Sequence, residues 1–354
     1  MAESERDSMD LKKFISEATS VTGTPGYEAP ISEYIAQAFR PLCDEVVIDR
    51  MNSVVSRKGQ GGPKFMICAH EDEIGMVVTK IEDDGCIRLT RTGGVDPRIL
   101  PAMEVNVLTE QGPLYGVIGA KPPHLVPIAD RKKSVLMEQV YVDVGLDAEE
   151  VKARVRVGDQ VVILGKTVEL ANDCLSAKTM DDRAGVATML ECANILNTMN
   201  TPAEVYLVAT CKEEVGCWGA AEAAYNLSPD VAIVVDVCHG EGPGTGKFEA
   251  YPLTKPVIAV GPNLHPVLTK KLKEIAAKHH IGYEIQACRG TTGTDAAATD
   301  ITREGIPTVL ISIPLKYMHT AVEVLSMEAV REVGRLMAHF INDLSREWED
   351  IKWY

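Results

Sequence analysis

The stretch Lys64-Phe-Met-Ile-Cys-Ala-His70-Glu-Asp-Glu-Ile-Gly75 reveals how this chain of 354 residues is organised. Its apolar residues, 65–69, run without interruption into a polar cluster that begins at His70. A short continuous apolar run is typical of a strand that is buried on both faces of a sheet. In open α/β sheets, ligands bind beyond the carboxyl ends of the strands. The stretch therefore predicts a buried strand with a functional site directly after it.

The segments after residue 166 alternate between predicted strands and predicted helices. We expect strands at 205–211, 231–236, 283–288 and 307–313. Amphipathic spacing predicts helices at 182–198, 219–225, 266–280 and 327–351, and two more before the first strand, at 10–18 and 29–40. This alternation is typical of an α/β fold, with a mainly parallel sheet covered by helices on both faces.

The region between residues 75 and 166 has a different character. Short β-prone pieces separated by Gly, Pro and Asp occur at 76–81, 86–90, 104–108, 115–118, 139–144 and 160–163. The one helix expected here is short, at 147–153. We therefore predict a small all-β domain, residues 75–166, inserted into a catalytic α/β domain formed by residues 1–74 and 167–354.

Composition limits the functional classes. The chain is 45% apolar and 25% charged, as expected of a folded protein, and its net charge of −15 argues against a nucleic-acid partner. No apolar run reaches the roughly 18 to 20 residues that span a bilayer. The acidic N-terminus lacks the apolar core of an export signal, and the nine cysteines contain no CxxC pair. We expect a cytoplasmic protein with reduced thiols.

Several separate segments deliver metal-ligating residue types to one edge of the predicted sheet. Each has an ordinary explanation when taken alone: a loop histidine, a helix N-cap or a solvated acidic pair. Their convergence is what indicates a site. The residues are His70, Asp181 or Asp182, Glu213, Glu214, Asp236 and His319.

Histidine and carboxylate side chains without cysteine suit zinc, cobalt or manganese. Two histidines and three carboxylates are enough for two metal ions if one carboxylate bridges them. Two such ions can polarise a carbonyl and generate hydroxide at neutral pH. One of the adjacent pair Glu213 and Glu214 can bind metal while the other handles a proton.

These residues lie in motifs that resemble one known family. Together the motifs are similar to the M42 metallo-aminopeptidases, the tetrahedral (TET) peptidases, some of which have been labelled cellulases. The resemblance covers roughly residues 10 to 345 and includes pieces of the inserted domain at 119–125 and 141–145. The motifs are His70-Glu-Asp-Glu-Ile-Gly, Ser176-Ala-Lys-Thr-Met-Asp181-Asp-Arg-Ala-Gly, Glu213-Glu-Val-Gly, Val235-Asp-Val, Gly293-Thr-Asp-Ala and Tyr317-Met-His.

The resemblance implies a role for each site residue. His70 and Asp236 would hold one metal ion, Glu214 and His319 the other, and Asp181 would bridge them. The family pattern favours Asp181 over Asp182 because related peptidases use the first residue of this pair.

Three further assignments follow from the resemblance or from neighbouring motifs. Glu213 would be the general base, and Asp72 would orient either the His70 imidazole or that base. Residues near the ends of strands would shape the pocket for the first substrate side chain. They are Thr294 and Asp295 in one loop, and His239 after Asp236.

The implied reaction is removal of the N-terminal residue from a short peptide with a free α-amine, with a metal-bound hydroxide as the nucleophile. The family also implies a homo-oligomer, from a dimer to a tetrahedral dodecamer, and an inserted domain that serves assembly or acts as a lid. The preferred N-terminal residue, the metal used in the cell and the final oligomeric state stay open.

Other functions are compatible with parts of the pattern. A two-metal deacylase or dipeptidase on the same core would differ only in its pocket. A glycosidase would need two opposed carboxylates and no metal. A catalytically silent scaffold would be expected to lack a ligand or the base. The chain departs from the family pattern at Lys212, directly before the Glu-Glu pair, and at Cys217-Trp218, after it. Both departures can alter the pocket.

Overall fold

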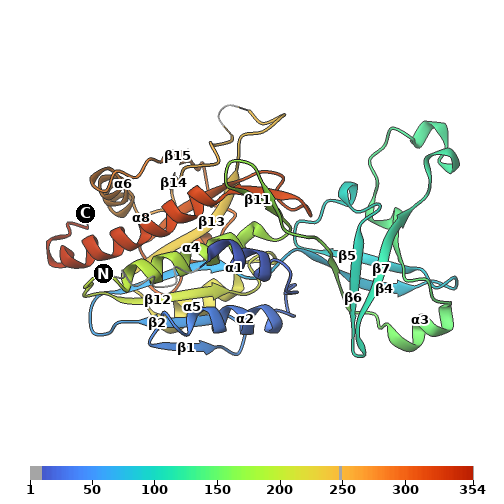
Figure 1. Ribbon diagram of the computed structural model, residues 1–354, viewed down its shortest axis with the longest axis horizontal. Coiled ribbons are helices and arrows are strands. Elements are labelled where there is room, and N and C mark those ends of the chain that lie inside the picture. Colours follow the sequence, from blue (N-terminus) through green and yellow to red (C-terminus); the bar gives the residue numbers. More distant parts are fainter. Residues whose placement is uncertain (1–9, 247–248, 354) are drawn as a thin grey trace, which may run out of the picture.

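The protein has a layered α/β core from which a small β-barrel projects, as Figure 1 shows for the computed structural model. The structure describes residues 10–246 and 249–353. The N-terminal residues that we expected to lack an export signal lie outside these ranges. The α/β class with an inserted all-β domain, predicted from the sequence, is confirmed.

The core is built on one eight-stranded sheet with the order β1-β2-β12-β3-β13-β16-β14-β15. Its four central strands are parallel, whereas β1, β2 and the pair β14–β15 run antiparallel to their neighbours. Strands β1, β2 and β14 were not predicted from the sequence. The bounds are β1 (Glu45–Ile48), β2 (Val54–Lys58), β3 (Lys64–His70), β12 (Glu204–Thr210), β13 (Val231–His239), β14 (Val257–Val260), β15 (Glu284–Ala287) and β16 (Thr308–Leu315).

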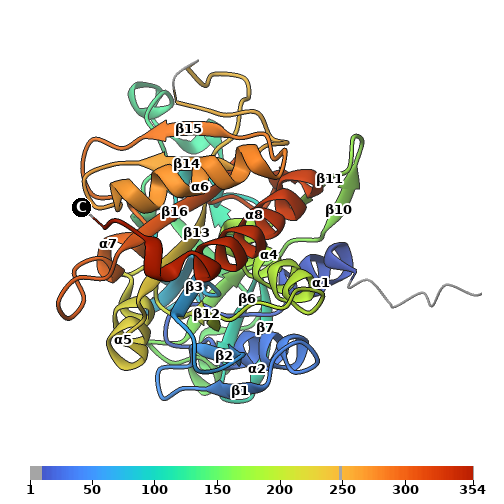
Figure 2. The ribbon, with the colours of Figure 1, turned by 90° about the vertical axis from the view of Figure 1, so that its left-hand side faces the viewer.

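Helices cover both faces of this sheet, as the turned view in Figure 2 shows. The larger layer packs α4 and α8 against β3, β13 and β16, with α1, α2 and α6 beside them. The smaller layer consists of α5 and α7. The bounds are α1 (Leu11–Ala18), α2 (Ala29–Phe39), α4 (Met180–Leu196), α5 (Trp218–Leu227), α6 (Pro266–Lys278), α7 (Ala296–Thr299) and α8 (Met327–Arg346).

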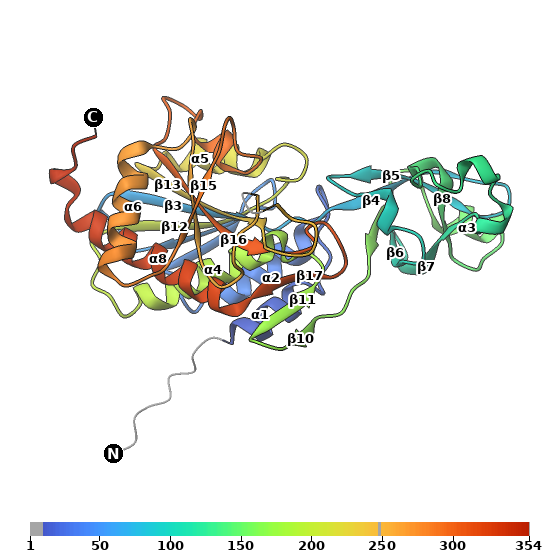
Figure 3. The ribbon, with the colours of Figure 1, turned by 90° about the horizontal axis from the view of Figure 1, so that it is seen from above.

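The inserted region forms a closed barrel of six strands in the order β4-β5-β8-β7-β6-β9. Closure leaves no free sheet edge, and inward-facing valines such as Val105, Val107 and Val161 are fully buried. Two segments join the barrel to the core (Figure 3). The bounds are β4 (Gly75–Ile81), β5 (Ile87–Thr92), β6 (Glu104–Thr109), β7 (Gly112–Ala120), β8 (Val140–Asp143), α3 (Ala148–Arg154) and β9 (Gln160–Ile163).

A three-stranded sheet that the sequence did not predict lies beside the core. It has the order β10-β11-β17, with bounds β10 (Val168–Leu170), β11 (Cys174–Ala177) and β17 (Glu323–Ser326). It joins the segment before α4 to the segment before α8. The predicted helix 327–351 is α8, which ends at Arg346 and is followed by a short 3-10 turn, Trp348–Asp350.

Among the helices in the described ranges, none combines the length and the apolar character needed to cross a bilayer.

Candidate metal centre

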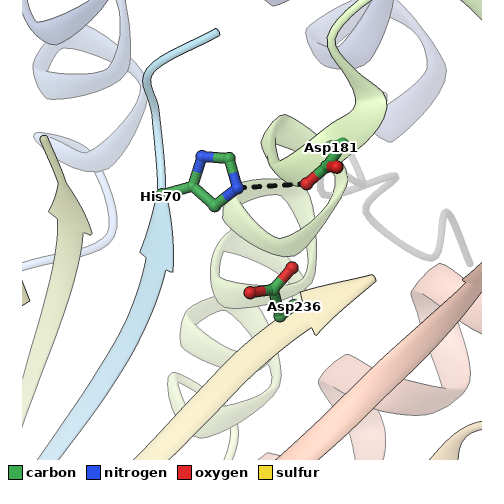
Figure 4. A group of neighbouring side chains, drawn as sticks. All are labelled: His70, Asp181 and Asp236. Atoms are coloured by element: carbon green, nitrogen blue, oxygen red, sulfur yellow. Dashed lines mark hydrogen bonds and ion pairs between the residues drawn. The ribbon is translucent and has the colours of Figure 1, made fainter. Parts of the chain in front are cut away.

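The parallel register of the central strands brings the predicted site residues together. His70 is the last residue of β3 and lies opposite Thr210 of β12. Asp236 lies on β13, three residues before that strand ends, and is paired with Ser312 of β16. Since the carboxyl ends of parallel strands meet at one edge, these side chains and the start of α4 converge there, as Figure 4 shows.

The Asp181 carboxylate lies at the centre of this group. Its Oδ1 is 3.0 Å from Nε2 of His70, and its Oδ2 is 3.1 Å from Nε2 of His319. The backbone of Asp181 is non-helical although the residue lies at the start of α4, and the peptide bond between Asp181 and Asp182 is cis. One carboxylate therefore faces two different histidines with its two oxygens.

Two overlapping triads of metal-ligating atoms share Asp181. In each, one donor atom per residue lies within 4.8 Å of the others. The first triad is His70, Asp181 and Asp236, the second is Asp181, Glu214 and His319. His319 Nε2 lies 3.3 Å from Oε1 of Glu214.

The orientation of both imidazoles fits metal binding. Nδ1 of His70 lies 3.2 Å from the carbonyl oxygen of Asp72, and Nδ1 of His319 lies 3.2 Å from the carbonyl oxygen of Gly94. A proton on each Nδ1 would donate to that carbonyl and leave the lone pair of Nε2 directed at Asp181. Metal-binding histidines commonly bond a carbonyl or carboxylate through the second nitrogen in this way. The residues present therefore fit divalent cations with nitrogen and oxygen ligands.

The electrostatics of the site also fit a cation. Burial, together with the negative charges of Asp182 and Glu213, raises the pKa of Asp236 well above its ordinary value. Burial opposes ionisation of Asp181 too, but hydrogen bonds from His319 and His70 hold its pKa below the usual range. Hydrogen bonds to Asp181 and Glu214 raise the pKa of His319 to about 11. Crowded buried carboxylates of this kind need positive charge between them.

The Asp72 carboxylate positions the Glu-Glu pair. Its Oδ1 accepts from the backbone N–H of Glu213 (3.0 Å) and its Oδ2 from that of Glu214 (3.2 Å). The carboxylate lies 3.7 Å from Nδ1 of His70, so that imidazole contacts both the carboxylate and the carbonyl of Asp72. Burial raises the pKa of Asp72 to about 7 and that of Glu213 to about 8.

Asp182 plays a different structural part from Asp181. It is fully buried, and its Oδ1 accepts from the backbone N–H of Gly185 in the first turn of α4 (3.1 Å). This contact is that of a capping side chain. No histidine in the described ranges hydrogen bonds to it, in contrast to Asp181.

The three residues proposed for the substrate pocket lie in different surroundings. Asp295 is only 2% exposed and accepts from the hydroxyl of Thr210 (2.5 Å), close to Glu213. Thr294 is half-buried and donates to Thr292 (2.9 Å). His239 is exposed at the end of β13.

Several residues that hold the centre in place were not predicted from the sequence. Glu323 on β17 accepts from the backbone N–H groups of Met180 (2.7 Å), Asp181 (3.2 Å) and His319 (2.7 Å), and so fixes two segments at once. Its position four residues after His319, at the start of an apolar run, is the only signal in the sequence.

A second missed group lies beneath the loop after β3. Glu73 is buried, forms an ion pair with Lys178 and accepts from the backbone N–H of Gly23 (3.0 Å). The fully buried Arg183 donates to the carbonyl oxygen of Glu71 (3.0 Å). Nothing in the spacing of Glu71 and Glu73 after His70 indicated these buried partners.

Comparison with known proteins places the chain in a family. Residues 52–336 match the family described as M42 glutamyl aminopeptidase. A lysyl aminopeptidase of Pyrococcus furiosus is 33% identical, over 91% of this chain and 94% of that protein. The structure of an aminopeptidase from the archaeon Desulfurococcus kamchatkensis is 36% identical, covers 96% of each chain and superposes with a TM-score of 0.89.

The assembled form of one relative is also known. The TET1 peptidase of Pyrococcus horikoshii, described as able to assemble into a tetrahedron or a large octahedral shell, is 30% identical with a TM-score of 0.83. The match covers 95% of this chain and all of that one. The chain therefore belongs to the M42 aminopeptidase family, as its motifs predicted.

Proposed function

We propose that the chain is a two-metal aminopeptidase that removes the N-terminal residue from short peptides. The observation that carries this proposal is the placement of the two Asp181 oxygens, each about one hydrogen-bond length from a different histidine. His70 and Asp236 would hold one ion, Glu214 and His319 the other, and Asp181 would bridge them. Two divalent ions of the zinc, cobalt or manganese class would polarise the scissile carbonyl and lower the pKa of water.

Glu213 is the group we assign to proton transfer. Its Oε2 lies 4.0 Å from Nε2 of His70, so the carboxylate borders the metal-binding residues. Glu213 is next in sequence to the proposed ligand Glu214 but belongs to neither of the two triads that share Asp181. Burial raises the pKa of Glu213, which strengthens its carboxylate as a base that takes a proton from water and returns it to the leaving amine. The two backbone hydrogen bonds to Asp72 keep it in place.

Recognition of the substrate requires a group for its free α-amine and a pocket for its first side chain. A spare carboxylate oxygen of the centre can pair with the amine. We propose that Thr294 and His239 line the pocket for the first side chain, and that Asp295 influences this pocket indirectly, from its position beside Glu213. The family description names glutamyl substrates, whereas the Pyrococcus furiosus relative is named for lysyl substrates. The two names differ, so neither assigns the N-terminal residue that this chain prefers.

We further propose that the chain works as a homo-oligomer in the cytoplasm. All nine cysteines are free, which suits a reducing compartment. The barrel, which we delimit as residues 75–166, would serve assembly or cover the site, and the core would consist of residues 1–74 and 167–354. The assemblies described for the relative support the oligomer.

A panel of fluorogenic aminoacyl substrates, with zinc, cobalt or manganese added, tests this function. Activity should disappear with a chelator. Glu213→Gln should lower kcat by roughly 10²- to 10⁴-fold, the usual contribution of a general base. Metal content, measured by elemental analysis, should stay at two ions per chain in that variant, and the exposed Glu304 changed to Gln serves as the matched control.

The alternatives make different predictions in the same assay. Two bound ions with no activity on any free-amine substrate would favour a deacylase, and hydrolysis of dipeptides alone would favour a dipeptidase. Activity that survives chelation would favour a glycosidase. Absence of both metal and activity would favour a silent scaffold.

A further inference from the structure

The thiol of Cys217 lies against the carboxylate that we assign as the base. The backbone N–H of Cys217 donates to the carbonyl oxygen of Glu213 (3.0 Å), which closes a turn at the start of α5. This turn brings the Cys217 thiol back to 3.5 Å from Oε1 of Glu213. The metal centre itself contains no sulfur ligand, so this contact adds a chemically different donor at its border.

Asp295 completes this group from a third direction. Its Oδ2 accepts from Thr210, while its Oδ1 is buried and, within the ranges 10–246 and 249–353, has no nitrogen or oxygen donor at hydrogen-bond distance; the weakly donating Cys217 thiol is the donor beside this carboxylate. The side chain is only 2% exposed. Donor atoms of Glu213, Cys217 and Asp295 lie within 4.8 Å of one another. A buried carboxylate oxygen without a partner is costly unless a donor or a cation satisfies it.

We propose that Cys217, Glu213 and Asp295 form a third cation site, selective for a thiophilic divalent ion such as zinc or cadmium, and that its occupation inhibits the enzyme. A thiolate ligand favours these ions over the harder manganese or magnesium. Cys217 is partly exposed, so a cation can enter from solvent. On binding, the Sγ–H proton leaves to solvent and the sulfur–metal bond forms.

Inhibition follows from the identity of one ligand. An oxygen of Glu213 that is bound to the third ion cannot accept a proton from water. The inhibitory part of this inference rests on the proposed function, whereas the cation site rests on the three side chains alone.

A cadmium titration of the enzyme loaded with only two zinc ions per chain, so that the third site starts empty, tests the proposal with two readouts. Cadmium–thiolate charge-transfer absorption in the ultraviolet reports sulfur coordination, and hydrolysis of an aminoacyl substrate reports inhibition. Wild type should gain the absorption band as its activity falls. In Cys217→Ser the absorption band should be lost. The half-inhibitory cadmium concentration should rise by about tenfold or more, because loss of a residue that merely hydrogen bonds to a metal ligand already weakens metal binding by that factor.

Two further variants keep the result interpretable. Cys86→Ser, at another partly buried cysteine in the barrel, should behave like wild type. Asp295→Asn should weaken cadmium binding while leaving the thiol in place, which separates the site from any effect of removing sulfur. If Cys217→Ser is inactive before cadmium is added, the band and equilibrium cadmium binding still decide.

Equal inhibition of wild type and Cys217→Ser would overturn the proposal, as would a band that persists in Cys217→Ser. A band without inhibition in an active wild-type enzyme would also overturn it. Failure of the proposed function looks different: the enzyme with only two zinc ions per chain and no cadmium would then hydrolyse no peptide, while the band would still report whether the third site exists.

Discussion

Individual residues decide how the histidines of the centre are held. His319 bonds through Nδ1 to the carbonyl oxygen of Gly94, which lies in a barrel loop far from it in sequence. A Cβ atom at residue 94 would lie 2.4 Å from that nitrogen and 2.6 Å from Cε1 of the same ring. Only glycine allows this approach, so the inserted domain contributes directly to the orientation of a proposed ligand.

Replacement of Gly94 by alanine should therefore displace the imidazole. We expect kcat/KM to fall on the order of 10²-fold, as for other displacements of about an ångström, together with weaker metal binding in a chelator competition. Gly282→Ala, where an added Cβ meets no atom within 4 Å, is the control and should keep wild-type values. Normal activity and metal affinity in Gly94→Ala would show that the ring does not depend on this contact.

Sequence alone could identify the proposed ligands but not the residues that orient them. His70, Asp181 and Asp236 follow or lie in recognisable strands and motifs, and the structure brings them together. Glu323 and Gly94 act through backbone groups of other segments. Such contacts depend on tertiary packing, which has no period or motif in the sequence.

At the scale of elements, hydrophobic pattern was sufficient for the buried strands and the long helices. β3 contains a continuous apolar run, β16 is mostly apolar and buried throughout, and α8 keeps a helical stripe of apolar residues over its length. Edge elements were missed because their burial is partial: β1 is mostly exposed and β10 fully so. The pairing β11–β17 joins distant segments and is a tertiary property.

The contact between α6 and α8 gives stability a pH dependence. Asp343 on α8 accepts from Nζ of Lys278 (2.8 Å) and lies 2.8 Å from Nε2 of His279. Burial opposes ionisation of Asp343, but these hydrogen bonds prevail and lower its pKa below the ordinary 3.8. Because the folded state binds this proton less readily than the unfolded chain, the stabilisation is present above pH 3.8 and is lost as the pH falls through the folded pKa.

Asp343→Asn should accordingly lower the free energy of unfolding by about 0.5–1 kcal/mol at pH 7, a modest value because Lys278 is largely exposed. Urea unfolding across a pH series measures this difference, which should shrink as the pH approaches 3. The exposed Asp350→Asn is the control. A difference that stays constant with pH would mean that the ionised form of Asp343 does not contribute.

On the scale of the whole molecule, the barrel carries apolar side chains that a solitary subunit would leave in water. Leu125 is 59% exposed, Ile128 82% and Leu136 57%, all on the connection between β7 and β8, and Tyr115 on β7 is 53% exposed. Several exposed apolar groups on one connection of a projecting domain are typical of an interface. This supports the proposed role of the barrel in assembly.

A charge at residue 128 should disrupt that interface. We expect Ile128→Asp to shift the protein to a smaller species in sedimentation velocity, because burial of an unpaired carboxylate opposes association. Val47→Asp, at an exposed apolar position on the edge strand β1, is the matched control and should keep the wild-type size. An unchanged sedimentation coefficient in Ile128→Asp would exclude residue 128 from the interface.

For the whole enzyme, we propose that two metal ions at one sheet edge act on the free end of a peptide. Mass spectrometry of one peptide in two forms, with a free and with an acetylated N-terminus, tests it most directly. The metal-loaded protein should remove residues stepwise from the free form, leave the acetylated form intact and lose all activity with a chelator. Cleavage of the acetylated peptide, cleavage at an internal bond, or trimming that survives chelation would rule out the proposed two-metal aminopeptidase.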